Sequence, residues 1–267
     1  MNLLEFKKFL KYYNAKNKAK LMTSFEYRTN AWMSFLGSLG YNFVQILFLS
    51  LLFDHVGSIA GWGKYQVLFL FSTGQLVFYL QYAFFGSVQD IMQDLILKGN
   101  LDKYLTKPVS TLLNITTFNF EIMEQLPPVV LTICILLYSL SHLNPVHWIN
   151  IVLYVFFLVV GIIVCTLVKL AIALLAFWFS DVSDLANMYD RTPELYGYPM
   201  DIYPGVLKYI FLVLIPIAPA AFIPSYFFLF GFKLDYFALT LLTFVIFYCL
   251  VMLLWRRGLK IYSSASS

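Results

Sequence analysis

The stretch WINIVLYVFFLVVGIIVCTLVKLAIALLAFWF, residues 148–179, decides the fold of this protein. Its one charged side chain is Lys169, and no proline interrupts it. About 20 mostly apolar residues are enough to cross the hydrocarbon of a bilayer. The stretch therefore predicts a transmembrane helix, and its surplus length predicts tilt or an extension into the cytoplasm.

The rest of the chain is of the same kind. Hydrophobic residues make up 61% of it and charged residues 12%, with a mean hydropathy of +0.77. A soluble domain carries about 25% charged residues, so this surface must face lipid. The expected fold is an all-α membrane protein with one transmembrane domain over residues 31–260. Its other five predicted spans are 31–53, 65–86, 118–140, 206–230 and 236–255.

The distribution of Lys and Arg predicts that both termini lie in the cytoplasm. With the N-terminus inside, 15 of the 18 basic residues fall on the cytoplasmic side, including Arg191 and Lys208 beside a predicted cytoplasmic loop over residues 180–205. The positive-inside rule favours that orientation over its inverse.

The two ends of the chain differ from the spans. Residues 1–30 combine seven basic residues with apolar residues at helical spacing, which predicts an amphipathic helix lying on the anionic inner leaflet. Docking of this helix on a soluble partner is the alternative. The Ser-rich residues 261–267 are expected to be a disordered tail.

No motif of an enzyme, a cofactor or a metal site stands out. The loop Gly57–Tyr65 has a glycine spacing one residue off a phosphate loop and a Tyr where Ser or Thr would hold magnesium. The cysteines Cys134, Cys165 and Cys249 all fall within apolar runs, as packing residues do. His142 and His147 have no further ligand near them, so no metal is expected there. We expect neither catalytic residues, nor a cofactor in this chain, nor nucleic-acid binding.

The connector over residues 87–117 has a pattern of its own. Apolar residues recur at helical spacing from Gln89 to Leu97, and Lys98-Gly99-Asn100 is typical of a helix stop. Leu101 to Leu105 predict one more helical turn before Pro108 ends it. Such a helix suits docking into a groove of a soluble partner. A solvated connector is the alternative.

The predicted fifth span contains Pro216, Pro219 and Pro224 within nine residues. Each proline removes a helical hydrogen bond, and a freed carbonyl group cannot stay unsatisfied in lipid. The segment must break, re-enter or face a protein-lined cavity. A purely structural kink is the alternative.

Besides Lys208 at the start of its span, three charged side chains fall within predicted spans. Lys169 has two interpretations, a contact with a buried partner or substrate, and snorkelling to the cytoplasmic interface. Glu121 and Glu124 are candidates for polar contacts inside the bundle, and Glu124 for a hydrogen bond across helices. A proton-coupled transporter would carry more such groups, so their scarcity argues against secondary transport.

Two longer stretches, KGNLDKYLTKPVS (residues 98–110) and YPMDIYPGVLKYIFLVLIPIAPAAFIPSYFFLFG (residues 198–231), resemble a known family. With the basic N-terminal helix and six spans, the chain is similar to the permease subunits of ABC-2 (type V) ATP-binding-cassette exporters of the bacterial cytoplasmic membrane. The resemblance implies a dimer with a second copy or a paralogue, on two separate ATPase subunits that bind ATP and magnesium.

The resemblance also implies roles for individual residues. The loop would be the coupling helix that receives the ATPase stroke, with the residues Lys98, Gly99, Leu101, Asp102, Lys103, Tyr104, Leu105 and Pro108. The proline-rich part would be a re-entrant element between spans 5 and 6, with Pro216, Pro219, Phe222 and Pro224. The expected activity is export of a lipid, amphipathic peptide or hydrophobic drug, because the walls are apolar and aromatic. A stand-alone secondary transporter or channel is the alternative.

Overall fold

The computed structural model describes residues 28–107, 110–117 and 121–262, and most of them are helical. The predicted amphipathic helix, the predicted disordered tail and Pro108 lie outside the described residues, apart from the ends of those two segments. Five long helices form the framework of the fold, and each is long and apolar enough to cross a membrane. They are α2 Arg28–His55, α3 Lys64–Phe85, α7 Ile122–Leu140, α8 Trp148–Leu174 and α12 Leu234–Ile261.

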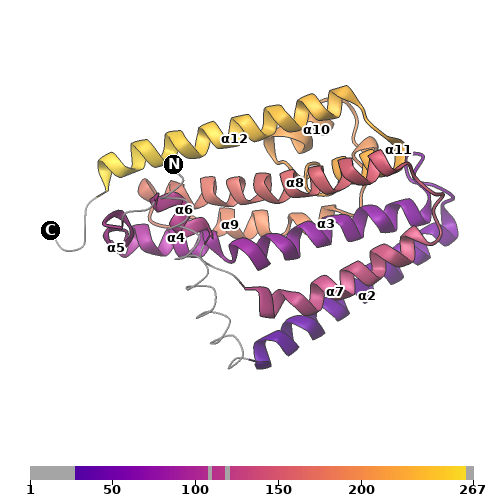
Figure 1. The fold of residues 1–267 in the computed structure, drawn as a ribbon, viewed down its shortest axis with the longest axis horizontal. Coiled ribbons are helices and arrows are strands. Elements are labelled where there is room, and N and C mark those ends of the chain that lie inside the picture. Colours follow the sequence, from indigo (N-terminus) through magenta and orange to yellow (C-terminus); the bar gives the residue numbers. More distant parts are fainter. Residues whose placement is uncertain (1–27, 108–109, 118–120, 263–267) are drawn as a thin grey trace.

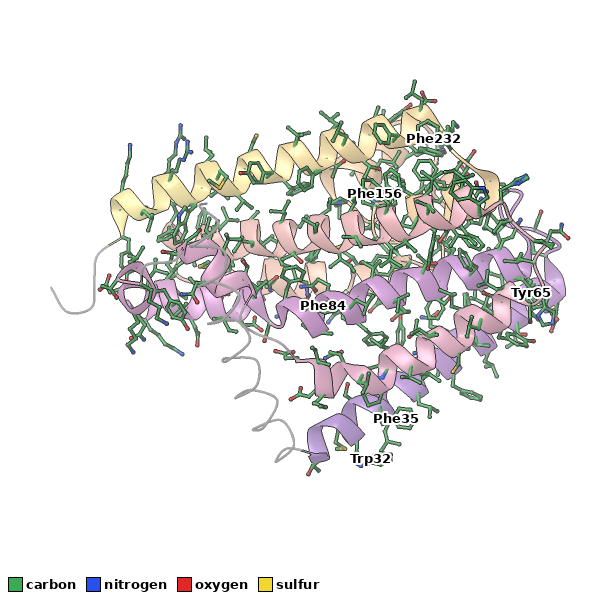
Figure 2. All side chains as sticks on the ribbon, in the orientation of Figure 1. Trp32, Phe35, Tyr65, Phe84, Phe156 and Phe232 are labelled. Atoms are coloured by element: carbon green, nitrogen blue, oxygen red, sulfur yellow. The ribbon has the colours of Figure 1, made fainter. Side chains whose placement is uncertain are left out.

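These helices run up and down side by side, with α3 in the middle of the bundle (Figure 1). Helix α3 packs on α7 on one side and on α8 on the other, and α12 packs on the far side of α8. Large side chains of α3, such as Phe69 and Phe71, are fully buried. On the outer helices apolar side chains point away from the bundle, as Trp32 of α2 does in Figure 2. Exposed apolar faces of this size are typical of helices that face lipid or a partner chain.

The two ends of the bundle differ in charge. We call one the basic end, because it carries the connector with Lys98 and Lys103 and the last turns of α12 with Arg256 and Arg257. The far end carries the connections α2–α3, α7–α8 and α11–α12.

The chain between α8 and α10 does not stay at the basic end. After a 3-10 turn that ends α8, η1 Leu175–Phe177, this crossing segment (residues 182–204) contains three short helices. They are α9 Ser183–Asp190, η2 Thr192–Leu195 and η3 Met200–Ile202.

Three contacts along this segment mark its course. Asp190 lies beside Lys169 near the basic end, and Tyr196 packs on Gly74 in the middle of α3. Asp201 accepts a hydrogen bond from Trp62 Nε1 at the far end, at 3.3 Å. The segment predicted as a cytoplasmic loop, 180–205, therefore runs through the bundle from one end to the other. Irregular backbone is tolerated at this depth only inside protein or beside water, and most of η2 and its flanks is buried.

The next part is a proline hairpin (residues 205–230), made of α10 Gly205–Tyr209, the π-helix η4 Ile210–Leu214, a turn, and α11 Phe222–Phe230. It starts at the far end, where Lys208 Nζ contacts Asp201 and the hydroxyl of Tyr236. It returns to the same end, where Asn150 Nδ2 donates to the carbonyl oxygen of Phe228 at 3.1 Å.

The tip of the hairpin rests on Gly161, the middle residue of α8. The prediction for residues 206–230 was a single span that starts in the cytoplasm, broken by its prolines. The break is present, but the structure places Lys208 at the far end, not beside a loop at the basic end. The count of basic residues could not reveal this position of Lys208. The preceding crossing segment is irregular and has no long apolar run, so the sequence gives no sign that it crosses the bundle.

Candidate functional site

The connector between α3 and α7 is built on α4 Val88–Leu97. Val88, Met92 and Ile96 recur every four residues, so they form one stripe, and all three are buried. This stripe packs in one cluster with Leu170 and Leu174 of α8. The connector is therefore attached firmly to the basic end of α8.

The predicted helix stop is present at the expected residues. Helix α4 ends at Leu97, and Gly99 has a φ of +63°, a left-handed conformation that suits glycine. A further helix, α5 Asp102–Leu105, follows as predicted. Leu101 between them is fully buried, and its backbone N–H donates to the hydroxyl oxygen of Tyr262 at 3.1 Å.

The outer surface of the connector is a tip that combines apolar and basic groups. Leu97 is 43% exposed and Leu105 38%, and the exposed Lys98 and Lys103 flank them. Lys98 forms an ion pair with Asp94 on the preceding turn. The predicted coupling residues thus split by place, with Leu101 inside and Lys98, Lys103 and Leu105 outside, while Asp102 and Tyr104 are half-buried.

The start of α7 closes the inner side of the connector. Glu121 Oε1 accepts hydrogen bonds from the hydroxyl and the backbone N–H of Ser87, at 3.0 and 3.2 Å. Glu121 thus joins the start of α7 to the start of α4. For Glu124 the described part of the chain contains no side-chain partner. Burial raises the pKa of Asp90 on α4, and the nearby Asp190 carboxylate adds to this, while Lys169 opposes it.

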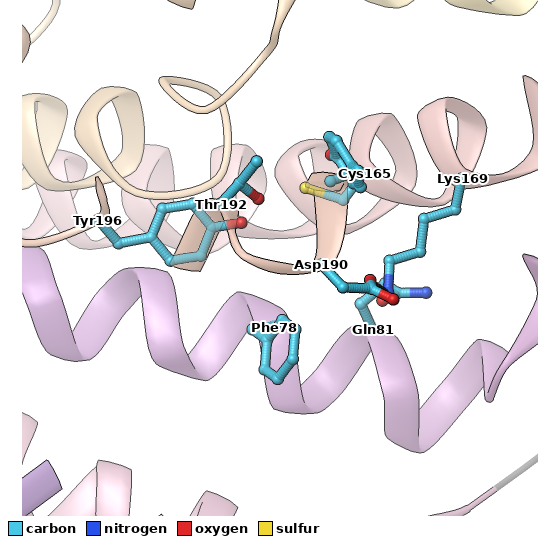
Figure 3. A pocket seen from close by; sticks show the side chains of 8 residues that line it. Phe78, Gln81, Cys165, Lys169, Asp190, Thr192 and Tyr196 are labelled. Atoms are coloured by element: carbon cyan, nitrogen blue, oxygen red, sulfur yellow. Dashed lines mark ion pairs between the residues drawn. The ribbon is translucent and has the colours of Figure 1, made fainter. Parts of the chain in front are cut away.

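A buried ion pair joins α8 to the crossing segment (Figure 3). Lys169 Nζ lies 2.7 Å from Asp190 Oδ1, and the same oxygen accepts a hydrogen bond from the Tyr82 hydroxyl at 3.1 Å. The ammonium group also lies 3.8 Å from the centre of the Tyr82 ring, within cation–π range. Lys169 is 4% exposed. The side chain therefore points into the bundle and forms an ion pair there.

The ion pair borders a cavity of about 10 Å³, large enough for one water molecule. Gln81 lines it, and its buried Nε2 has no hydrogen-bond partner. The rest of the wall is made of Phe78, Cys165, Tyr189, Thr192 and Tyr196. The space is too small for a transported molecule, so this centre connects α3, α8 and the crossing segment instead of binding a substrate.

The tip of the proline hairpin is the second unusual element. Pro216, Pro219, Phe222 and Pro224 are all buried, so the prolines face protein and not lipid. The Ala218 N–H donates to the Phe211 carbonyl oxygen at 3.3 Å, and the Ile223 N–H donates to the Ala218 carbonyl oxygen at 2.9 Å. Backbone bonds across the turn thus replace part of what the prolines remove.

The basic half of the bundle has a large apolar cavity of about 550 Å³ between α8 and α12. It is partly open, and its polar lining is confined to a few hydroxyl and ring groups. Its lining includes Thr116, Ile163, Leu167, Phe244, Tyr248 and Trp255. A second apolar cavity of about 290 Å³ lies on the other side of the same two helices, and Ile215 of the hairpin is part of its lining.

The sequence analysis did not identify Asp190 and Tyr82, which contact Lys169, or Asp201, which contacts Lys208. The one feature of the sequence that pointed to Asp190 was the acidic stretch after residue 180, but the sequence alone places that stretch in a loop. Gly74 and Gly161 were missed as well, because a glycine in a span gives no sign of which segment will pack on it.

The family model described as ABC-2 family transporter protein matches residues 39–266. The match covers all five long helices, the connector, the crossing segment and the hairpin, except for the first turns of α2. No curated protein and no solved structure shows significant similarity to the chain. A family match over this much of the chain, with a helical bundle of membrane-spanning length, leads to one conclusion: the chain belongs to the ABC-2 family of transporter proteins.

Proposed function

We propose that this chain is the permease subunit of an ATP-driven exporter in a bacterial cytoplasmic membrane, with ATP hydrolysed on separate ATPase subunits. The observation that carries the proposal is the connector tip. It is exposed at the basic end, and it is rigidly joined through α4 to α8. Membership of a family of transport membrane components supports the proposal.

The connector fits the role of a coupling helix. Leu97 and Leu105 would enter an apolar groove on the ATPase, and Lys98 and Lys103 would meet its acidic rim. A push on this tip would reach α8 through the stripe Val88, Met92 and Ile96. From α8 it would pass to the crossing segment through Lys169 and Asp190. Both termini and the basic end would then be cytoplasmic, which satisfies the positive-inside rule even with Lys208 moved to the far end.

The apolar cavity between α8 and α12 favours an amphipathic or hydrophobic substrate. It lies in the basic half of the bundle, which would be the inner leaflet side, and it is partly open. A molecule with a long apolar part would enter it with little desolvation cost, whereas an ion would lose its hydration shell there.

Co-purification tests the proposal. The tagged chain would be expressed in its native host and isolated in mild detergent, with Lys103→Glu as the matched variant. We expect stoichiometric capture of an ATPase by the wild type and much weaker capture by the variant. A stand-alone secondary transporter or channel predicts the opposite, namely gradient-driven transport in liposomes that contain only this chain and no ATP. Recovery of the intact chain without an ATPase would count against the exporter.

A further inference from the structure

Near the basic end, the crossing segment and its neighbours hold an ammonium group between a carboxylate and a tyrosine ring. Lys169 Nζ lies 2.7 Å from Asp190 Oδ1 and 3.8 Å from the centre of the Tyr82 ring. The carboxylate and the face of the ring both attract the cation, so two groups stabilise it at a depth where water is scarce.

The same three kinds of group meet again at the far end of the bundle. Asp201 Oδ1 lies 2.7 Å from Lys208 Nζ, which also donates to the hydroxyl oxygen of Tyr236 at 3.2 Å. The chain thus places a carboxylate of the crossing segment, a tyrosine and an ammonium group together twice. Between these two carboxylates the sequence has one further acidic residue, Glu194.

Glu194 lies deep within the span of the bundle. Tyr196, two residues on, packs on Gly74, which is ten residues from the start of α3 and eleven from its end. Glu194 is exposed and forms no ion pair with any described residue, the nearby Arg191 included. An ionised carboxylate at this depth has a large cost in free energy unless a positive or polar group covers it.

Tyrosines surround Glu194 as they do the other two carboxylates. The hydroxyl of Tyr41, in the middle of α2, is close enough to Glu194 to interact with its charge, and it is similarly close to the hydroxyls of Tyr79 and Tyr198. The Tyr41 ring lies 6.3 Å from that of Phe71. Among the described residues, no ammonium group lies over any of these rings. The carboxylate and the aromatic groups of the pattern are present here, and the ammonium group is not.

Buried polar groups without a hydrogen-bond partner lie beside these tyrosines. Gln75 neighbours Tyr41, and Asn42 neighbours Tyr79. Asn42 is 2% exposed and Gln75 1%, and Asn42 Oδ1, Gln75 Nε2 and the Tyr41 hydroxyl bond to none of the described residues. Unsatisfied groups of this kind are costly in the membrane interior. The amide oxygen and the hydroxyl are free to accept hydrogen bonds from a donor such as an ammonium group.

We propose that Glu194, Tyr41, Tyr79 and Tyr198 form a cation site that binds the ammonium group of an amphipathic substrate. The ligand supplies at mid-depth the positive group that lysines supply at the two ends. The inference rests on the proposed function and names its substrate class, an organic amine with a long apolar part. Calcium and magnesium ions require several oxygen ligands, whereas one carboxylate among aromatic rings suits an organic cation.

Binding of a fluorescent amine tests the site. The full-length chain in nanodiscs of phosphatidylcholine, which has no net charge, is titrated with dansylcadaverine, an amphipathic primary amine, and with its uncharged N-acetyl derivative. We expect the wild type to bind the amine about tenfold more tightly than the derivative, equivalent to ~1.4 kcal/mol. Glu194→Gln should bind the two probes alike, because it keeps the shape of the side chain and loses its charge. Glu194→Asp should keep a preference for the amine.

Asp184→Asn is the matched control. It removes a carboxylate from an exposed position of the same segment, outside the cation site, so the preference for the amine should stay at the wild-type level. The preference is a ratio of two affinities measured on one preparation, so a smaller folded fraction in a variant does not change it. Loss of the preference in Asp184→Asn as well would show a general effect of charge and refute the site.

The inference is also overturned if the wild type shows no preference for the amine, or if Glu194→Gln retains it. Capture of the ATPase is measured for the same variants. A wild type that captures the ATPase without preferring the amine removes only this inference. A preference for the amine without any capture of an ATPase removes the proposed function and leaves the cation site.

Discussion

Gly161 and Pro219 meet without room for a side chain. A Cβ on Gly161 would lie 2.4 Å from the carbonyl oxygen of Pro219, so the tip of the proline hairpin rests directly on the backbone of α8. Close approach of this kind is a common use of small residues in membrane helices. It fixes the depth of the hairpin at the middle of α8.

We expect Gly161→Ala to destabilise the protein by about 1–3 kcal/mol, because the added methyl group pushes against backbone that cannot rotate away. Thermal unfolding in detergent measures the loss. The control is Gly37→Ala on α2, where a Cβ would meet nothing within 4 Å. Equal melting temperatures for the two variants would show that the hairpin is not seated as described.

Lys169→Met should be strongly destabilising, by roughly 3–5 kcal/mol, because it leaves the Asp190 carboxylate without its counter-charge. Asp190 is about one-third exposed, so the lower part of that range is expected. The double variant Lys169→Met with Asp190→Asn should recover much of the loss, since no uncompensated charge remains. A double-mutant cycle by thermal unfolding checks this, and purely additive losses would refute a direct pair.

The turn after α4 depends on the left-handed backbone of Gly99. Gly99→Ala is expected to cost about 1 kcal/mol, and Gly99→Asn less, because asparagine adopts this conformation more readily. The readout is ATPase capture together with thermal stability. If alanine and asparagine behaved alike, the conformation of this turn would not be the reason for the glycine.

Lys103→Glu is expected to uncouple hydrolysis from transport. The side chain is exposed on the connector tip, so its reversal should leave the fold intact. Transport should fall by about tenfold, equivalent to ~1.4 kcal/mol, because fewer ATPase subunits dock, while the subunits that remain bound continue to hydrolyse ATP. Lys260→Glu at the same end, outside the connector, serves as the control. An unchanged transport rate would remove the coupling role.

The course of the chain after α8 predicts where a label can react. Val206 is 76% exposed and lies at the far end, so Val206→Cys should react with a membrane-impermeant maleimide in intact cells. Leu105→Cys on the connector tip should react only after permeabilisation. Both are made in a background with the exposed Cys134 and Cys249 replaced by serine. Labelling of Val206→Cys only after permeabilisation would restore the cytoplasmic position that the sequence suggested for this region.

Local features were the ones that could be predicted from the sequence. The helix over 88–97, its stop at Gly99 and the turn that follows depend on residues within a few positions of one another. The break at Pro216 and Pro219 is equally local, because each proline removes a helical hydrogen bond and clashes with the turn before it. The partner of Lys169 was out of reach, since Asp190 lies 21 residues further along a segment with no regular period.

By itself, then, the sequence determined the solvent of this protein and five of its six predicted spans. Lipid requires windows of about 20 apolar residues, and five of them fold as continuous helices. Only the tertiary structure decided that residues 182–204 cross the bundle and that residues 205–230 turn back at the middle of α8. Irregular backbone can lie at membrane depth only where other helices satisfy and cover it. The crossing segment packs on Gly74 and the hairpin packs on Gly161. The role of these two glycines becomes visible only when the helices are packed together.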